Sequence, residues 1–174
     1  TAASGGMQSG AITLVVPAGW SAPSTTGANA GYTTASTGTV AVASQTMTVS
    51  NVTLAGGATM TITYGDTSGG GTGATVTSST GAQTWQAQQK ARSTGTLTNV
   101  TAGSPSITVY AADGAGTMGA SISAVSASQT GRTVTFTYTA PAGGISGGAV
   151  SVDVPSGWSA PSTTGSAAGY TTSS

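Results

Sequence analysis

Two stretches of this chain carry nearly the same sequence, and they decide how the rest is organised. Residues 11–27 read AITLVVPAGWSAPSTTG, and residues 149–165 read AVSVDVPSGWSAPSTTG. The second stretch follows the first by 138 residues, and the match extends over residues 5–36 (the first block) and residues 143–174 (the second block). A fixed offset of this kind is typical of a tandem repeat. We therefore expect an excerpt of a longer chain of repeats, holding one full period and about a quarter of the next.

The differences between the blocks indicate which side chains face inward. Positions 12, 14 and 16 are apolar in the first block and stay apolar in the second, whereas Val15 becomes Asp153. Apolar residues at every second position predict a β-strand with one buried and one wet face. The Gly-Trp pair that follows turns the chain. We expect Trp20, and Trp158 after it, to fold back on the core as structural aromatic residues rather than to form a ligand platform.

The remaining sequence predicts further short strands and an all-β fold. Ser44-Gln45 is typical of a tight hairpin, and a slip of the apolar phase predicts a bulge near Ser50-Asn51. A short helix is the alternative at residues 82–91, because Gln, Ala and Lys are good helix formers. Residues 111–116 are expected to be a linker of small residues. The expected strands are 11–16, 39–43, 46–50, 58–64, 82–91, 96–98, 106–110, 121–125 and 133–138. The expected core residues are Ile12, Leu14, Val16, Met60, Ile62, Tyr64, Val134, Phe136 and Tyr138.

A resemblance adds to this reading. The stretch VPSGWSAPSTTG at residues 154–165, preceded by TVTFTYT at residues 133–139, resembles tandem immunoglobulin-like modules of giant Gly/Thr/Ser-rich bacterial cell-surface proteins. The resemblance covers essentially the whole period. It implies immunoglobulin-like β-sandwich modules strung in an extracellular fibre, stalk or adhesin, and it implies no catalytic residues. A β-solenoid is the alternative fold, although no internal period of about 20–30 residues is visible.

We expect a module boundary near residue 113. Residues 1–112 are then a β-sandwich module that lacks its first strands, and residues 113–174 supply the first strands of the next module. A sandwich without two of its strands exposes apolar surface and unpaired backbone groups. Residues 113–138 therefore either fold back on their own chain or complete a neighbouring module by strand exchange. Exchange is expected for a polymer subunit, and independent beads on a string for an arbitrary excerpt. The exchanged residues would be Ile122, Val125, Val134, Phe136 and Tyr138.

The composition argues against an enzyme and against any cofactor. The chain has no His, Cys or Glu, so a hydrolytic triad, a thiolate nucleophile and most metal sites have no members. The three acids are Asp66, Asp113 and Asp153, which are expected in a loop, in a linker and on a wet strand face. A site built from paired carboxylates would require them to converge.

The low charge content limits the classes of partner that this chain can bind. Charged residues make up 3% of the chain, against about 25% in an ordinary soluble domain. Nucleic acid is a poor partner, because three cations cannot form the basic face that counterion release requires. No apolar run has the length of a membrane-spanning helix. A net charge of zero removes the repulsion that keeps proteins apart, so copies of the chain itself are the expected partners.

Several residues are candidates for ligand binding or modification. Asp113, in an Asp-Gly pair at the module junction, is a candidate calcium ligand, although calcium takes about six or more oxygen ligands. Asn51 and Asn99 each begin an N-glycosylation sequon. Lys90, the single lysine, is a candidate for an isopeptide cross-link, although no Glu is present to promote the reaction.

These observations predict a structural repeat unit of an extracellular filament or giant surface stalk, which self-associates through strands and hydroxyl-rich surfaces. The alternative is an adhesin module that binds surface glycans or a neighbouring cell through the loops around Gly19-Trp20 and Asp66–Gly73. A third hypothesis is ice binding. It rests on rows of outward threonines at positions 59, 61 and 63 and at positions 133, 135 and 137, which would have to lie side by side on a flat sheet.

Overall fold

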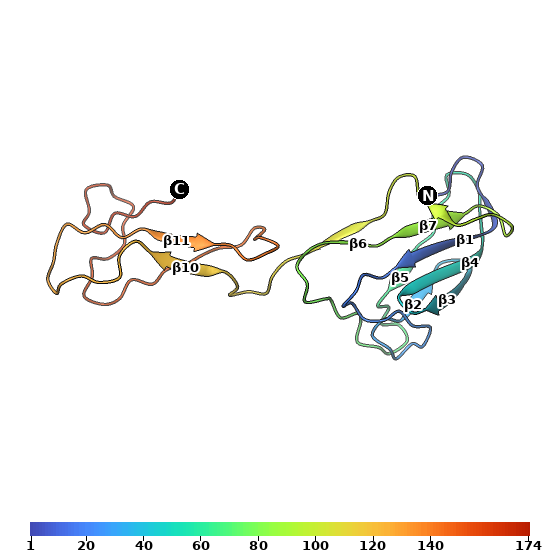
Figure 1. The fold of residues 1–174 in the computed structure, drawn as a ribbon, viewed down its shortest axis with the longest axis horizontal. Helices are drawn as coiled ribbons and strands as arrows, with labels where there is room; N and C mark the ends of the chain where they lie inside the picture. The colour runs from blue at the N-terminus through green and yellow to red at the C-terminus, as the bar shows by residue number, and fades with distance from the viewer. The chain divides into compact units, whose positions relative to one another are not determined.

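The computed structural model describes residues 1–174 and consists of β-strands without any helix, which confirms the all-β expectation (Figure 1). It accordingly offers no helix that could span a membrane. The chain divides into two compact units, Thr1–Ala111 and Ala112–Ser174. The strands are β1 (Met7–Val15), β2 (Thr33–Ala35), β3 (Thr39–Ala43), β4 (Thr46–Leu54), β5 (Ile62–Tyr64), β6 (Gly81–Thr84), β7 (Ala87–Lys90), β8 (Thr98–Asn99), β9 (Ser106–Val109), β10 (Thr117–Ala120) and β11 (Phe136–Thr139).

The first unit is organised around a five-stranded sheet in the order β3-β4-β1-β7-β8. Figure 1 labels four of these strands, β3, β4, β1 and β7. Two smaller ladders accompany it, β2 with β5 and β6 with β9. All pairings between named strands are antiparallel, which differs from the parallel stacking of a β-solenoid. β1 lies inside the sheet, with β4 on one side and β7 on the other, so both edges of its backbone have partners.

The hairpin and the bulge expected in β3 and β4 are both confirmed. β3 and β4 pair around the turn at Ser44, which has a φ of 50°. Opposite β1, Ile12 aligns with Val49 whereas Gly10 aligns with Val52, so β4 holds one extra residue there. Asn51 lies in this bulge with a φ of 56°, a left-handed conformation that Asn tolerates better than most residues. The bulge lets Met47, Val49 and Val52 all be buried despite the slip in alternation.

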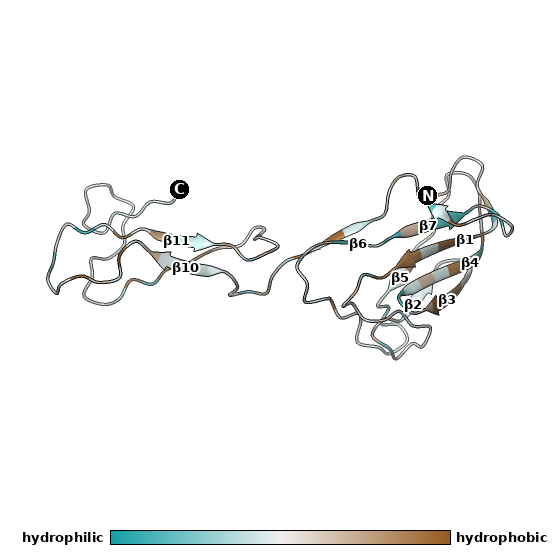
Figure 2. Ribbon diagram, viewed as in Figure 1, coloured by the Kyte–Doolittle hydropathy of each residue, from teal (hydrophilic) through white to brown (hydrophobic).

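The core of the first unit combines aliphatic and aromatic side chains. Val16, Met47 and Trp85 form its buried centre, and Leu14, Trp20, Val42 and Tyr64 pack against them. Figure 2 shows that β1, β3 and β4 all carry hydrophobic residues. The Trp85 ring meets Trp20 edge to face at a centroid distance of 5.2 Å and Tyr64 at 5.1 Å. The Tyr64 hydroxyl donates a hydrogen bond to the Ser21 carbonyl, while burial raises the pKa of Tyr64.

Residues 82–91 form strands rather than a helix, but not the single long edge strand that we expected. The segment divides into β6 and β7, and β7 lies inside the sheet between β1 and β8. The division falls at Trp85, whose side chain is buried in the core while its backbone N–H donates to the Pro105 carbonyl at 2.8 Å. One residue later the Gln86 carbonyl accepts from the Val15 N–H at 3.0 Å. The chain thus changes from the β9 ladder to the β1 ladder across Trp85.

The second unit contains one hairpin, β10 paired with β11, followed by the second block. The strand expected at residues 121–125 was wrong, since β10 occupies residues 117–120. Tyr138 explains this register, because its hydroxyl donates to the Ala115 carbonyl at 2.7 Å and holds Met118 opposite Tyr138. The expected strand 133–138 is likewise displaced, to 136–139.

The core expectation was partly wrong as well. Leu14, Val16 and Tyr64 belong to the core of the first unit, whereas Phe136 is 49% exposed. Ile12, Met60, Ile62, Val134 and Tyr138 are partly buried. The strand expected at residues 58–64 shortens to β5, although its alternation of partly buried apolar and exposed Thr side chains is confirmed.

Replacing Met47 by Ala should destabilise the first unit by about 2–5 kcal/mol, because the change removes buried atoms and leaves a cavity. Met47 is 1% exposed in the parent. Urea denaturation followed by tryptophan fluorescence measures this, since Trp20 and Trp85 both lie on the core. Met118→Ala is the matched control, because Met118 is 42% exposed and lies in the second unit. A Met47→Ala chain as stable as the parent would contradict the assigned core.

Candidate association surfaces

The two repeated blocks fold into the same loop. In the first block the Ser24 N–H donates to the Gly31 carbonyl, and in the second the Ser162 N–H donates to the Gly169 carbonyl, both at 2.9 Å. A β-carbon on either glycine would clash with a backbone carbonyl oxygen, that of Ala22 or its counterpart in the second block. Only glycine allows this close approach. The loop is therefore specified locally, by residues that both blocks share.

The strand that precedes the loop differs between the blocks. Residues 7–15 form β1, whereas the matching residues 145–153 form no strand and are exposed throughout. Val16 is 1% exposed, but Val154 at the same place in the repeat is 41% exposed. Val150 and Val152 are 50% and 44% exposed. We call Val150, Val152, Val154 and Trp158 the second-block face.

The first block shows what this face lacks. Leu14 aligns with Met47 of β4 on one side and with Ala87 of β7 on the other, and both partners are buried. In the second unit no strand pairs with residues 145–153. A strand needs neighbours to satisfy its N–H and carbonyl groups, so without them the second block keeps its loop and loses its strand.

The two equivalent tryptophans show the same contrast. Trp20 is partly buried on the core, as expected, whereas Trp158 is 51% exposed, so the expectation was wrong for the second block. The backbone N–H of Trp20 donates to the Pro17 carbonyl at 3.4 Å, and the backbone N–H of Trp158 donates to the Pro155 carbonyl at 3.3 Å. The backbone turn is thus the same, and only the aromatic surroundings supplied by Trp85 are missing.

A second candidate surface is the open edge of the main sheet. β3 has β4 as its one neighbour, and its outward residues Thr39, Ala41 and Ala43 are exposed. Natural edge strands are commonly protected by Lys, Pro or bulges, and β3 has none of these. The opposite edge, β8, is two residues long. The β3 edge is therefore the better template for pairing with another strand.

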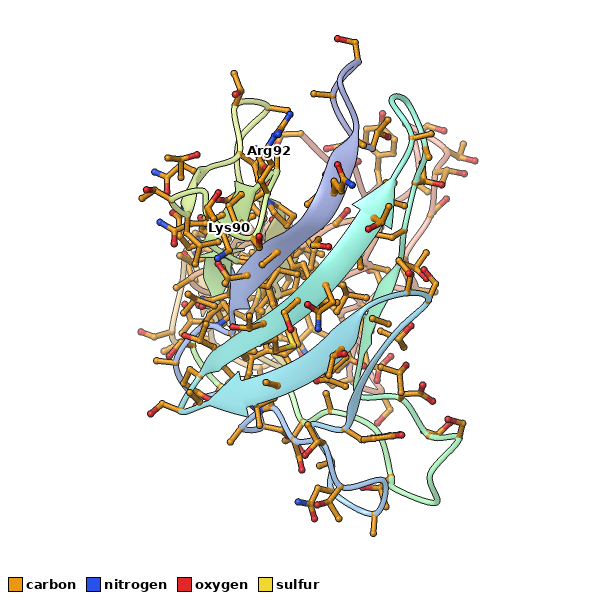
Figure 3. The ribbon with its side chains drawn as sticks, turned by 90° about the vertical axis from the view of Figure 1, so that its right-hand side faces the viewer. Lys90 and Arg92 are labelled. Atoms are coloured by element: carbon orange, nitrogen blue, oxygen red, sulfur yellow. The ribbon has the colours of Figure 1, made fainter.

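The cations do not form a binding patch. Lys90 ends β7 and Arg92 lies in the turn that follows, on the same side of the unit (Figure 3). The Lys90 amine donates to the Ser93 carbonyl at 2.8 Å, which fixes it within its own turn. Arg132 belongs to the second unit. This arrangement gives the proposed isopeptide cross-link no support, because the hydrogen-bond partner of the Lys90 amine is a backbone carbonyl and not an Asn side chain.

The three acids do not gather into one site. Asp66 accepts hydrogen bonds from the Thr34 hydroxyl at 2.5 Å and from the Ser68 N–H at 2.8 Å, and these bonds lower its pKa. Asp113 and Asp153 are exposed. No group of three acidic or other metal-binding side chains comes together anywhere in the chain, so Asp113 does not belong to such a group.

Both glycosylation candidates are exposed. Asn51 lies in the β4 bulge, and Asn99 ends β8 with its side-chain oxygen accepting from Gln86 at 3.1 Å and Gln88 at 3.2 Å. Modification of either residue remains a prediction.

The candidate exchange residues all lie in the second unit. Ile122, Val125 and Phe136 are 37%, 41% and 49% exposed, and Val134 and Tyr138 are partly buried. β10 and β11 pair with each other, so this segment already has a partner within its own unit. The second-block face was not predicted, because the repeat shows that residues 145–153 match β1 but not whether strands pair with them.

The loops and threonine rows of the alternative hypotheses are also placed. The loop Asp66–Gly73 packs against the repeated loop, because a β-carbon on Gly27 would lie 2.8 Å from the Gly69 Cα. Thr63 lies in β5 of the first unit and Thr137 in β11 of the second, so the two threonine rows do not share a sheet. The flat array that ice binding requires is not formed within either unit.

Neither a protein-family model, nor a curated protein, nor a solved structure matches this chain. The internal repeat is therefore the most informative comparison that the chain offers. It presents one block whose residues 7–15 form a strand inside a sheet and one block whose matching residues, 145–153, form no strand and are exposed.

The Asp66 hydrogen bonds predict an acid-sensitive first unit. A carboxyl whose pKa is lower in the folded than in the unfolded chain contributes stability above the unfolded pKa and loses it as pH falls through the folded pKa. We expect the free energy of unfolding to fall as pH drops below about 4. Asp66→Asn should flatten this dependence, measured by urea denaturation at a series of pH values.

Asp113→Asn is the matched control, because Asp113 is exposed and lies outside the first unit. It should leave the pH dependence of that unit unchanged. An Asp66→Asn chain with the parent's pH dependence would show that these hydrogen bonds do not stabilise the loop.

Proposed function

We propose that this chain is a structural repeat unit of an extracellular filament or cell-surface stalk, built from immunoglobulin-like β-sandwich modules joined in tandem. One observation carries the proposal: the second block repeats the loop of the first, but its residues that match β1 form no strand and are exposed. A unit that exposes an apolar face until further protein covers it suits a chain of joined modules. Monomeric soluble proteins rarely expose large contiguous apolar patches without such a purpose.

The composition supports a structural and extracellular role over a catalytic one. The chain has no Cys or His, and its acids do not gather into a site. Its surface is rich in Thr, Ser and Gly and nearly free of charge. Such a surface stays hydrated through hydroxyl groups while offering little electrostatic repulsion to neighbouring copies.

Length is the property that a stalk needs, and it can be measured directly. Arrays with increasing numbers of the 138-residue period, imaged by electron microscopy, should lengthen by a constant increment for each added period. The reason is that each period would form one module in series. Compact particles whose length does not grow with the number of periods would contradict the proposal.

Lateral association should proceed through the β3 edge and should persist in salt. Because the association would not depend on charge, sedimentation of the arrays should be nearly the same at about 0.1 and 1 M NaCl. Ala41→Lys combined with Ala43→Lys should reduce bundling at low salt, since lysines on an edge strand oppose strand pairing. Ala41→Ser combined with Ala43→Ser is the control for size and polarity and should bundle like the parent. Equal bundling of the lysine and serine variants would exclude the β3 edge.

A glycan-binding adhesin is the second candidate. The loop Asp66–Gly73 favours it, because the Asp66 hydrogen bonds and the contact with Gly27 hold the loop in one shape. The packing of Trp20 on the core weighs against it, because that aromatic ring is not free to stack on a sugar. Retention of the arrays on immobilised glycans, abolished by substitutions within residues 66–73, would favour the adhesin.

A further inference from the structure

We propose that the second-block face is the docking site for a segment equivalent to residues 37–111 of another copy of the repeat. This segment, the covering segment, would lie on the second block as β4 and β7 lie on β1. The inference rests on the proposed tandem structure and deepens it by naming the partner of each block. A complete module would then consist of residues 112–174 followed by a covering segment.

The first unit shows that the two segments are complementary. Its core cluster divides cleanly between them: the block supplies Leu14, Val16 and Trp20, and the remaining members come from residues 37–111. Those remaining members are Val42, Met47, Tyr64 and Trp85. The second block, which has no covering segment, leaves Val150, Val152, Val154 and Trp158 exposed. A block without a covering segment therefore still needs a partner that buries its apolar side chains and pairs with its backbone groups.

The side chains of the second block would pack against a covering segment without overpacking. At the inward positions Ile12 becomes Val150 and Leu14 becomes Val152, while Val16 is retained as Val154. At the buried position 13, Thr is replaced by Ser151. Each change keeps or reduces volume, and cores tolerate a small loss of volume better than strain from added atoms.

The charge and the backbone of the second block fit equally well. Val15 is 37% exposed, so Asp153 would keep its carboxylate in water. Ser9 has a φ of 49°, and Gly147 at the same place in the repeat has a φ of 63°. Glycine adopts such angles at less cost than serine, so the second block enters the strand with less backbone strain than the first.

Within residues 1–174 no covering segment is free for the second block, because residues 37–111 already cover the first. The test therefore extends the full chain by a second copy of residues 37–111 joined after Ser174. Hydrogen exchange measured by mass spectrometry reports on residues 148–158, whose peptides differ in sequence from those of the first block. We expect exchange there to slow by about 100-fold or more on extension, because strand amides acquire partners.

The control extension carries Met47→Asp in the added copy alone. Met47 is the β4 partner of Leu14, the counterpart of Val152, and a buried carboxylate there would prevent docking. Exchange of residues 148–158 should then return to the rate of the unextended chain. Equally fast exchange in the parent and extended chains would overturn the proposal.

A disulfide gives a second measurement, and it is unambiguous because the chain has no Cys. Val152→Cys paired with Met47→Cys in the added copy should cross-link on oxidation, since facing residues of antiparallel strands lie within disulfide range. Asp153→Cys with the same partner is the matched control and should not cross-link, because its side chain would point to the other face. Equal cross-linking of the two pairs, or none from the Val152→Cys pair, would refute the register.

Two outcomes separate this inference from the proposed function. Protection of residues 148–158 in the extended chain, with arrays that do not lengthen, would support the docking and refute the filament. Protection that arises in the unextended chain as its concentration rises would show that the face pairs with its own counterpart on another molecule, and would overturn the covering segment as its occupant.

Discussion

The pairing of β1 with both β4 and β7 is the interaction on which the first unit depends. It satisfies the backbone of β1 on both edges and brings Leu14 and Val16 onto the core that Met47 and Trp85 complete. The second block has nearly the same residues and the same loop, yet it forms no strand. The difference lies in the range of the hydrogen bonds. The loop closes through bonds between residues less than a dozen apart, whereas β1 depends on partners from distant parts of the chain.

Trp85 has a role in this arrangement that its position in the sequence does not suggest. Its ring contacts both Trp20 and Tyr64 edge to face. The strand before it, β6, pairs with β9, and the strand after it, β7, pairs with β1. Large aromatic side chains contribute much of the apolar burial in small domains. One residue thus joins the repeated loop, the β5 strand and the main sheet into a single core. Trp158 keeps the turn of Trp20 without any equivalent of these neighbours, which explains its exposure.

Much of the first unit could be predicted from the sequence, because its signals are local. Alternation located β3, β4 and β9, and the phase slip after Val49 located the bulge at Asn51. The division of residues 82–91 could not be predicted, since it depends on where the core lies relative to Trp85. The register of β10 depends on the hydrogen bond from the Tyr138 hydroxyl to the Ala115 carbonyl. These two residues lie on opposite sides of a long turn, and the sequence pattern does not fix the length of that turn. The second-block face was missed because alternation shows which side chains can be buried but not whether a partner is present.

The scarcity of charge connects the fold to the proposed role. A chain with 3% charged residues has few groups with which to repel a neighbouring chain or to protect an edge strand. Most folded monomers carry more surface charge, because exposed apolar faces and open sheet edges without it lead to uncontrolled association. Here the exposed apolar residues of the second block match a covering segment that the chain itself encodes, and the open edge belongs to a short strand with small outward side chains. The exposed apolar residues are an advantage when modules are held in series. A tethered covering segment then has a high effective concentration, so it reaches its block before another molecule can.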